Sequence, residues 1–247
     1  MEEALLKKRI AELRKRAEFA YRTEFTDFLT LSEATTAKTV LTGVNHRFYG
    51  GMPDAERVML CIAHEDLEIT EEQFPICGIR IVPKSPKFAE SLSHRDVLGS
   101  VLGLGLERNV IGDIYLKEKE AYLLCAEKIA PFLTEQLTQV RHTQVVCSIA
   151  EAEESEFKKE FAVINRTVSA LRLDAVAAAS FGVSRSSTAA AISGGKLFVN
   201  GKETLSPSLL VKEGDVISFR GEGKARLTQI GGLTKKERIS ITIERYQ

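Results

Sequence analysis

Basic side chains that could bind phosphate gather in the last third of this sequence, at the predicted starts of two short helices. Arg172 precedes an apolar run, and Arg185 and Ser186 follow Ser184, a residue type that caps helix N-termini. The first backbone N–H groups of a helix are unpaired and lie at the positive end of its dipole, so they favour anions. A guanidinium adds a planar fork of donors that fits phosphate oxygens. The pattern therefore predicts a phosphate-binding surface at these two helix starts.

A predicted hairpin extends this surface. Asn200-Gly201 separates two short runs, and this dipeptide accepts the positive φ angles of a two-residue turn. The basic residues in and after the hairpin are Lys196, Lys202, Arg220, Lys224 and Arg226. We expect them to bind RNA together with the residues of the two helix starts.

The distribution of charge supports a polyanionic partner. The formal net charge is zero, but residues 166–247 carry 13 Lys and Arg against 7 Asp and Glu. Residues 1–165 carry 21 against 27, so a basic end balances an acidic remainder. Because the basic residues gather at helix starts and turns, RNA binding is favoured over a solvated, lightly basic domain.

Sequences that resemble catalytic motifs are incomplete. His94-Arg95-Asp96 is similar to the kinase catalytic loop, but Val101 stands where that loop needs Asn. Arg172-Leu173-Asp174 resembles the tripeptide around the catalytic Asp of pseudouridine synthases, whose large catalytic domain this chain has no room for. We therefore expect Asp174 to orient Arg172 or to cap the helix. The four histidines form no zinc pattern, so no metal, cofactor or catalytic group is predicted.

The predicted elements indicate an α+β protein with three domains. Residues 1–74 form an N-terminal α/β domain, with helices over 1–22 and from Thr30 to near Gly43, and a strand over 57–63. Residues 75–150 have the order β-α-β-β-α-β of the ferredoxin-like fold, which RRM-type RNA binders share. Its strands are expected at 76–82, 110–116, 121–126 and 143–149, and its helices at 94–102 and 127–137. RRM domains stack bases on exposed aromatic residues of the central strands, but the strands here offer only Tyr115 and Tyr122. Stacking on this sheet is therefore a weak prediction.

The charged segment EAEESEFKK predicts a linker over residues 151–165, and residues 166–247 form the third domain. Its helices are expected over 171–181 and from Ser184 to near 194, and its strands at 196–199, 202–204, 215–220, 225–230 and 239–243. The four cysteines form no C-x-x-C pair, which indicates buried free thiols in a reducing compartment. No apolar run reaches membrane-spanning length. We expect a cytoplasmic monomer without a membrane or small-molecule partner.

The third domain resembles a known RNA-binding module. The motifs are R-L-D-x-x-x-A at 172–178, S-R-S at 184–186, I-x-x-G-K-L-x-V-N-G at 192–201 and G-D-x-I-S at 214–218. Together they are similar to the αL motif shared by the fourth small-subunit ribosomal protein (S-four), tyrosyl-tRNA synthetases and pseudouridine synthases. The resemblance implies a role in RNA binding for Arg172, Ser184, Arg185, Lys196 and Asn200. Many of these modules have Lys where this chain has Ser187, which removes one expected phosphate contact.

The similarity extends over nearly the full length. F-Y-G-G-M-P-D-A-E-R at 48–57, S-H-R-D-V-L-G-S at 93–100, G-D-I at 112–114, R-G-x-G-K-A-R-L at 220–227 and T-K-K-x-R-I at 234–239 resemble the YlmH family. This resemblance implies a non-enzymatic factor of ribosome-associated quality control that binds rRNA of the large ribosomal subunit and holds peptidyl-tRNA. It also implies that Ser93, His94, Arg95 and Asp96 form a turn and a helix start. The family also carries an older cell-division label, and related cyanobacterial proteins a photosystem II label.

Two alternatives remain open at this point. One is an RNA-modifying enzyme that uses the third domain to deliver substrate, which would need a carboxylate or nucleophile in a pocket of residues 1–150. The other is an interaction protein for cell division or photosynthetic membranes, against which the lack of an amphipathic membrane anchor counts.

Overall fold

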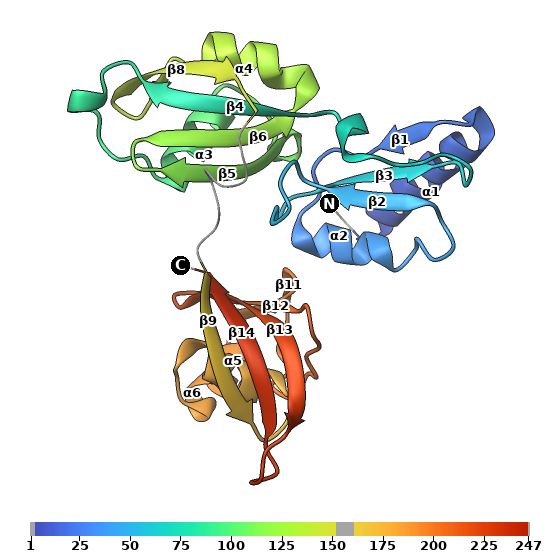
Figure 1. The fold of residues 1–247 in the computed structure, drawn as a ribbon, viewed down its shortest axis with the longest axis vertical. Helices are drawn as coiled ribbons and strands as arrows, with labels where there is room; N and C mark the ends of the chain where they lie inside the picture. Colours follow the sequence, from blue (N-terminus) through green and yellow to red (C-terminus); the bar gives the residue numbers. More distant parts are fainter. Residues whose placement is uncertain (1–2, 152–160, 247) are drawn as a thin grey trace. The chain divides into compact units, whose positions relative to one another are not determined.

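Figure 1 shows the fold of a computed structural model of the chain, which describes residues 3–151 and 161–246. The chain divides into two compact units, Met1–Lys158 and Lys159–Gln247. Both units combine helices with antiparallel sheets, which confirms the α+β class. Of the helices in the described ranges, none is long and apolar enough to cross a membrane.

The first helix covers a small sheet at the start of the first unit. Leu6, Ile10, Leu13 and Ala17 recur every three or four residues, so they form one buried apolar stripe. The elements are α1 (Glu3–Ala20), β1 (Thr23–Phe25), α2 (Leu31–Lys38), β2 (His46–Tyr49) and β3 (Met59–Ala63). The strands pair in the order β1-β3-β2, so β3 is central and all five of its residues are buried.

This region differs from the prediction at two strands and one helix end. The sequence does not predict β1 and β2, because β1 has three residues and β2 lacks the alternating burial of a half-buried strand. The helix α2 starts after Thr30, as predicted, with a capping box in which the Thr30 hydroxyl accepts from the Glu33 N–H at 3.2 Å. It ends at Lys38, well before Gly43, because the N–H groups of Thr39 and Val40 close short turns onto carbonyls three residues back.

The middle of the first unit has the predicted order of elements. A five-stranded sheet, β5-β6-β4-β8-β7, carries two helices on one face, and its four long strands have the ferredoxin-like arrangement. The elements are β4 (Ile76–Pro83), α3 (His94–Gly103), β5 (Ile111–Lys117), β6 (Glu120–Ala126), α4 (Ala130–Gln136), β7 (Gln139–Val140) and β8 (Thr143–Ile149). Short 3-10 turns lie at Glu71–Gln73, Pro86–Phe88, Arg108–Val110 and Glu127–Ile129. Residues such as Ile79, Ile81 and Leu123 pack with Val97 and Leu133 of the helices in the main core.

The other face of this sheet is covered where its aromatic residues lie. Tyr115 and Tyr122 are buried in a cluster with Met52 and Leu124. The Tyr122 hydroxyl donates to the Ala150 carbonyl at 3.1 Å. A Cβ at Gly78 would lie 1.7 Å from that hydroxyl oxygen, so glycine makes room for the ring. Neither tyrosine is exposed for RRM-type stacking.

Residues 1–74 and 75–150, predicted as separate domains, lie in one compact unit and share buried contacts. Arg57 donates through its guanidinium to the carbonyls of Ile111 at 2.8 Å and Phe28 at 3.2 Å. The carboxylate of Asp113 accepts from the N–H groups of Glu56 at 2.7 Å and Arg57 at 3.1 Å. These bonds tie the end of the first region to β5 of the second.

The second unit is a six-stranded sheet with two helices on one face. Figure 1 shows α5 and α6 behind the strands β9, β14 and β13. The elements are β9 (Phe161–Val168), α5 (Leu173–Phe181), α6 (Arg185–Ser193), β10 (Leu197–Val199), β11 (Lys202–Glu203), β12 (Val216–Phe219), β13 (Gly223–Leu233) and β14 (Ile239–Tyr246), and the sheet order is β11-β10-β12-β13-β14-β9. Val176 and Ile192 of the helices pack with Leu227, Ile241 and Ile243 of the sheet.

The strand β9 begins five residues before the predicted start of this domain. Its residues pair with β14 along its whole length, from Phe161↔Tyr246 to Val168↔Ile239. As an edge strand, it carries polar residues on both faces, and its sequence therefore lacks a clear period of two. The predicted linker 151–165 thus overlaps β9, and residues 152–160 lie outside the described ranges.

Candidate nucleic-acid interface

Two arginines from different helices share one buried carboxylate. Arg185 Nε donates to Asp174 Oδ2 at 3.0 Å, and Arg172 Nε donates to Asp174 Oδ1 at 3.2 Å. Second bonds from the Nη2 atoms, at 3.4 Å and 3.3 Å, make both contacts two-pronged. The Asp174 side chain is 6% exposed, whereas those of Arg172 and Arg185 are 39% and 49% exposed. This Arg172–Asp174–Arg185 group, called here the arginine clasp, holds two cations in place and leaves part of each guanidinium open to a ligand.

The predicted positions of Arg172 and Arg185 and the predicted contact of Asp174 with Arg172 agree with the structure. Arg172 is the N-cap of α5 and Arg185 is the first residue of α6, so both lie at helix starts. Gly182 ends α5 with φ of 71°, a left-handed conformation that suits glycine, and lets the chain turn directly into α6. Because the two helix starts lie side by side, Arg172 and Arg185 both reach Asp174, and Asp174 orients the Arg172 side chain.

The carboxylate of Asp174 stays ionised in this setting. Burial alone raises the pKa of Asp174, but hydrogen bonds from Arg172 and Arg185 and their positive charges outweigh it, so the pKa lies below its usual value. The clasp thus carries one net positive charge, and its geometry is fixed before any ligand arrives.

The serines that precede and begin α6 are occupied with capping. The Ser184 hydroxyl accepts from the Ser187 N–H at 3.1 Å, which confirms Ser184 as the N-cap. It also lies 3.0 Å from the Ser186 hydroxyl and 2.7 Å from the Ser187 hydroxyl. All three serines are exposed, so the hydroxyls of Ser186 and Ser187 can face a ligand, but Ser187 brings no charge.

The hairpin turn forms as predicted, and its asparagine has structural partners. Asn200 and Gly201 have φ of 51° and 75°, the two positive angles that the turn requires. The Asn200 amide donates to Asp215 Oδ1 at 2.7 Å and accepts from the Val216 N–H at 2.9 Å. Asn200 therefore joins the turn to the start of β12, and an RNA contact from it stays a prediction. Lys202 lies beyond the turn and is exposed.

The other predicted basic residues lie away from the clasp. The Arg220 N–H donates to the Lys196 carbonyl at 3.0 Å, which places both at the ends of β10 and β12. Lys224 and Arg226 alternate along β13 with Ala225 and Leu227, which face the helices. Since successive strand residues point to opposite faces, Lys224 and Arg226 lie on the face without helices. Of the ten predicted residues, Lys224 and Arg226 thus lie on the opposite face of the sheet from the helices that carry Arg172 and Arg185.

Two arginines that the sequence reasoning did not single out lie near the clasp. A hollow of about 390 Å³ is lined by Arg166 of β9, Arg185 of α6 and Arg238 of the turn before β14, beside small residues of α5. Arg238 is held by Thr167, donating to its carbonyl at 2.6 Å and its hydroxyl at 3.0 Å. The sequence indicated these two arginines only through the excess of positive charge in residues 166–247. It could not place them beside Arg185, because β9 was not predicted.

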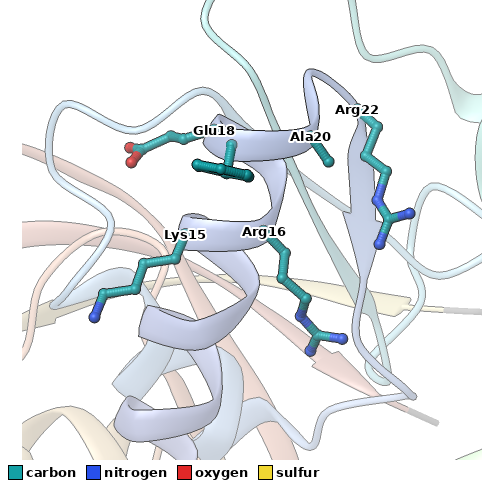
Figure 2. Close-up of a pocket in the computed structure, with 6 residues that line it drawn as sticks. Lys15, Arg16, Glu18, Ala20 and Arg22 are labelled. Atoms are coloured by element: carbon teal, nitrogen blue, oxygen red, sulfur yellow. The ribbon is translucent and has the colours of Figure 1, made fainter.

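A second basic surface lies at the end of α1 in the first unit. Figure 2 shows Lys15 and Glu18 extending from one side of α1 and Arg16 from the other, with Arg22 on the segment that follows the helix. These residues line a hollow of about 710 Å³. Phe19, which also lines it, is 97% exposed. Glu24 lies within 4.0 Å of Arg16 and 2.5 Å of Arg22, so it neutralises part of this charge. The surface is open and its cations do not converge, unlike those of the clasp.

The residues that resemble a kinase loop form a helix start. The Ser93 hydroxyl accepts from the Asp96 N–H at 3.2 Å, and the Asp96 carboxylate accepts from the Ser93 N–H at 3.1 Å. The side-chain hydrogen bond from Ser93 lowers the pKa of Asp96. This capping box at the start of α3 accounts for Ser93 and Asp96 without a catalytic role.

One hollow in the first unit contains groups that could do chemistry. It measures about 530 Å³ and is lined by Glu71, Glu72, Cys77 and Tyr122 among others. Burial, with a further contribution from Glu127, raises the pKa of the Cys77 thiol, so this thiol is a poor source of thiolate. Glu71 is paired with Arg47. Within the described ranges, no three His, Cys, Asp or Glu residues are grouped to hold a metal ion.

Comparisons with known proteins match both the region of the ferredoxin-like sheet and the region of the arginine clasp. Residues 70–154 match a family model described as a putative RNA-binding domain in YlmH, and residues 171–217 match the S4 domain. A protein of Bacillus subtilis (strain 168), Ribosome-associated protein quality control protein P2, is 35% identical over 232 residues, which span 92% of this chain and 89% of that protein.

A solved structure is also similar. Cell division protein ylmH from Streptococcus pneumoniae aligns with a TM-score of 0.54 and covers 63% of this chain and 94% of its own. It is 20% identical, so this likeness concerns the fold alone. The two domain matches and the extent of the Bacillus similarity, taken with the clasp and the ferredoxin-like sheet, show that this chain belongs to the YlmH family.

Proposed function

We propose that this protein is a non-enzymatic, cytoplasmic RNA-binding factor of ribosome-associated quality control. In this role it binds rRNA of the large ribosomal subunit and peptidyl-tRNA when translation has stalled. The arginine clasp is the observation that carries the proposal. The name of the Bacillus relative, which describes a ribosome-associated quality control protein, supports the assignment to the ribosome.

The clasp suits structured RNA because its cations are fixed. Ordering a long side chain on binding costs about 0.5–1.5 kcal/mol, and Asp174 has already ordered two. The exposed parts of both guanidiniums remain available as donors to phosphate oxygens. Arg166 and Arg238 add positive charge along the hollow beside Arg185. A rigid phosphate backbone with a matching spacing would bind with little reorganisation of the protein.

The absence of catalysis is part of the proposal. The hollow lined by Cys77 and Glu71 is the candidate for an RNA-modifying activity, and its thiol has a raised pKa. Incubation of the protein with labelled rRNA should yield no modified base. A modified nucleoside that disappears in Cys77→Ala or Glu71→Gln would establish the enzyme alternative instead.

The test of RNA binding is co-sedimentation with large ribosomal subunits. The double variant Arg172→Glu with Arg185→Glu should abolish co-sedimentation at moderate salt while the protein stays folded. The matched control is Arg16→Glu with Arg22→Glu, which makes the same change of charge in the first unit. The control should retain most of the binding. Persistent co-sedimentation of the clasp variant would show that the site lies elsewhere.

Salt dependence gives an independent measurement. Several phosphate contacts should give a log–log slope of affinity against salt of about −4 to −6. The clasp variant should have a shallower slope by about 2, because two phosphate contacts are lost.

A further inference from the structure

Aromatic and basic side chains form a row across the helix-free face of the second unit's sheet. Register places Phe198 opposite Ser218 and Ser218 opposite Lys224. At the other side of the sheet, Tyr246 lies opposite Phe161. Residues opposite each other on paired strands point to the same face, so these side chains share one surface. The row runs Phe198, Ser218, Lys224, Tyr246, Phe161, and every member is half-buried.

Contacts between the side chains confirm the row. The ring centroids of Phe161 and Tyr246 lie 5.0 Å apart in an edge-to-face arrangement. Lys224 Nζ lies over the Tyr246 ring, 5.5 Å from its centroid. The Arg220 guanidinium lies over the Phe198 ring at 4.7 Å. One end of the row is therefore the Phe198 ring with Arg220 against it, and the other is the Phe161–Tyr246 ring pair, with Lys224 against Tyr246.

The helices lie on the opposite face. Leu197, Ile217 and Ala225, the strand neighbours of the row, belong to the core that α5 and α6 complete. Among the described residues of this unit, no helix covers the row (Figure 1). Val163, on the same face of β9, is 64% exposed.

We infer that this face binds an unpaired segment of RNA, with one base stacked at each aromatic end of the row and a phosphate at the lysine between them. The inference deepens the proposed function and rests on it. Strands are spaced by about 4.8 Å, so Phe198 and Tyr246, three strands apart, lie about 14 Å from each other. Lys224 stands between the two ends of the row.

The charge of the face favours RNA over a protein partner. Arg220, Lys224 and Arg226 contribute three cations to it, whereas Glu244, which lies opposite Arg226, and Glu203, which lies opposite Phe198, contribute two anions. Base-stacking surfaces on other sheets combine the same two components, aromatic rings and a positive groove for the backbone. The face is separate from the clasp, which lies at the helix starts on the other side of the sheet.

The experiment compares two RNA probes on the full chain. One is a labelled single-stranded oligouridine, and the other is a fully paired RNA hairpin with no unpaired segment beyond its loop. Tyr246→Ala should weaken oligouridine binding by about tenfold, and Phe198→Ala with Tyr246→Ala by about a hundredfold, since each stacked base contributes about 1–3 kcal/mol. Binding of the paired hairpin should change by less than about twofold.

Matched variants separate stacking from folding. Tyr246→Phe keeps the ring and should retain the affinity for oligouridine, whereas Tyr246→Leu keeps an apolar side chain without a ring and should lose it. Val163→Ala is the control on the same face. The chain has five tyrosines and no tryptophan, so oligouridine should quench tyrosine fluorescence in the wild type and quench it less in Tyr246→Phe.

The outcomes distinguish this site from the clasp. Arg172→Glu with Arg185→Glu should reduce hairpin binding and spare oligouridine binding. If this variant abolishes both, or if Tyr246→Leu binds oligouridine as well as the wild type, the sheet face is not a stacking site. If the wild type binds oligouridine but not the hairpin, the proposed function of the clasp fails while the sheet site stands. Protein capture by this face without oligouridine binding would also overturn the inference.

Discussion

The two large sheets of this protein have the same construction but use their second face differently. Each carries helices on one face and places aromatic residues on the other, Tyr115 and Tyr122 in the first sheet and Tyr246 with Phe161 in the second. In the first unit, a segment around Met52 covers Tyr115 and Tyr122. In the second unit, Tyr246 and Phe161 remain half-buried beside Lys224. Aromatic residues on a sheet therefore indicate a stacking site only when no upstream segment packs on them.

The chemistry of the tyrosines follows the same division. Burial, together with the nearby carboxylates of Asp113, Asp54 and Glu56, raises the pKa of Tyr115. The Tyr115 ring packs in the buried cluster with Met52, which joins the two halves of the first unit. The ring of Tyr246 instead has a cation against it and is only half-buried.

The largest expected effect comes from truncating one tyrosine in each sheet. Tyr122→Ala should lower the free energy of unfolding of the first unit by about 3–5 kcal/mol, because a buried ring and its hydrogen bond to Ala150 are lost. Tyr246→Ala should cost the second unit about 1 kcal/mol, which is the edge-to-face contact with Phe161. Urea unfolding followed by hydrogen exchange mass spectrometry reports the two units separately. Equal losses in both units would break the comparison.

The next largest loss of stability is expected in the segment around Met52 that covers the first sheet. Met52→Ala removes a buried side chain above the tyrosines and should destabilise the first unit by about 2–4 kcal/mol. Val163→Ala, on the open face of the second sheet, should change stability by less than about 0.5 kcal/mol. A gain of oligouridine binding in Met52→Ala would mean that the first sheet is a stacking surface held closed by its cover.

A smaller loss of stability is expected when Asn200 is replaced in the hairpin at the edge of the second sheet. Asn200→Ala should cost about 1–2 kcal/mol, because Asp215 and the Val216 N–H lose their partner in the turn. Asn200→Gly keeps a residue that adopts positive φ, so it should recover part of this loss. If both variants are as stable as the wild type and bind RNA more weakly, the amide acts on RNA rather than on the turn.

The last prediction concerns how the stability of the second unit depends on pH in the acidic range. Since the folded-state pKa of Asp174 lies below its usual value of about 3.9, its ion pairs contribute fully above about pH 4 and are lost as the pH falls through the folded-state value. The stability difference between the wild type and Asp174→Asn should therefore be constant from pH 5 to 7 and shrink below pH 4. Urea midpoints for the second unit measure this. A difference that grows in acid would contradict the assigned charge state.

The sequence predicted the elements with strong local signals. The helix starts after Thr30 and Ser93 and the Asn200-Gly201 turn formed where expected, because each depends on residues within a few positions. The strands β1, β2 and β9 were missed, since each is short or at an edge and is specified by its partner strand. Long-range pairing of this kind leaves little local pattern.

The candidate site was predicted in its residues but not in its layout. Arg172 and Arg185 were placed together from their positions at helix starts, and Asp174 was assigned to orient Arg172. Lys224 and Arg226 lie on the other face of the sheet from these arginines. This placement depends on strand register, which a count of charges along the sequence does not reveal. Arg166 and Arg238 were missed for the same reason, because they meet the hollow only once β9 pairs with β14.

The shared carboxylate of the clasp also constrains how this sequence can evolve. If Arg172 or Arg185 alone is replaced, the remaining arginine still neutralises Asp174, and the group becomes neutral. Replacing both leaves a buried anion without its two cations, so the second substitution is more harmful than the first. Such residues show strong epistasis, since their energies do not add. The two arginines and the aspartate should therefore be inherited as a unit, and a lineage that loses one member would be expected to change the other two.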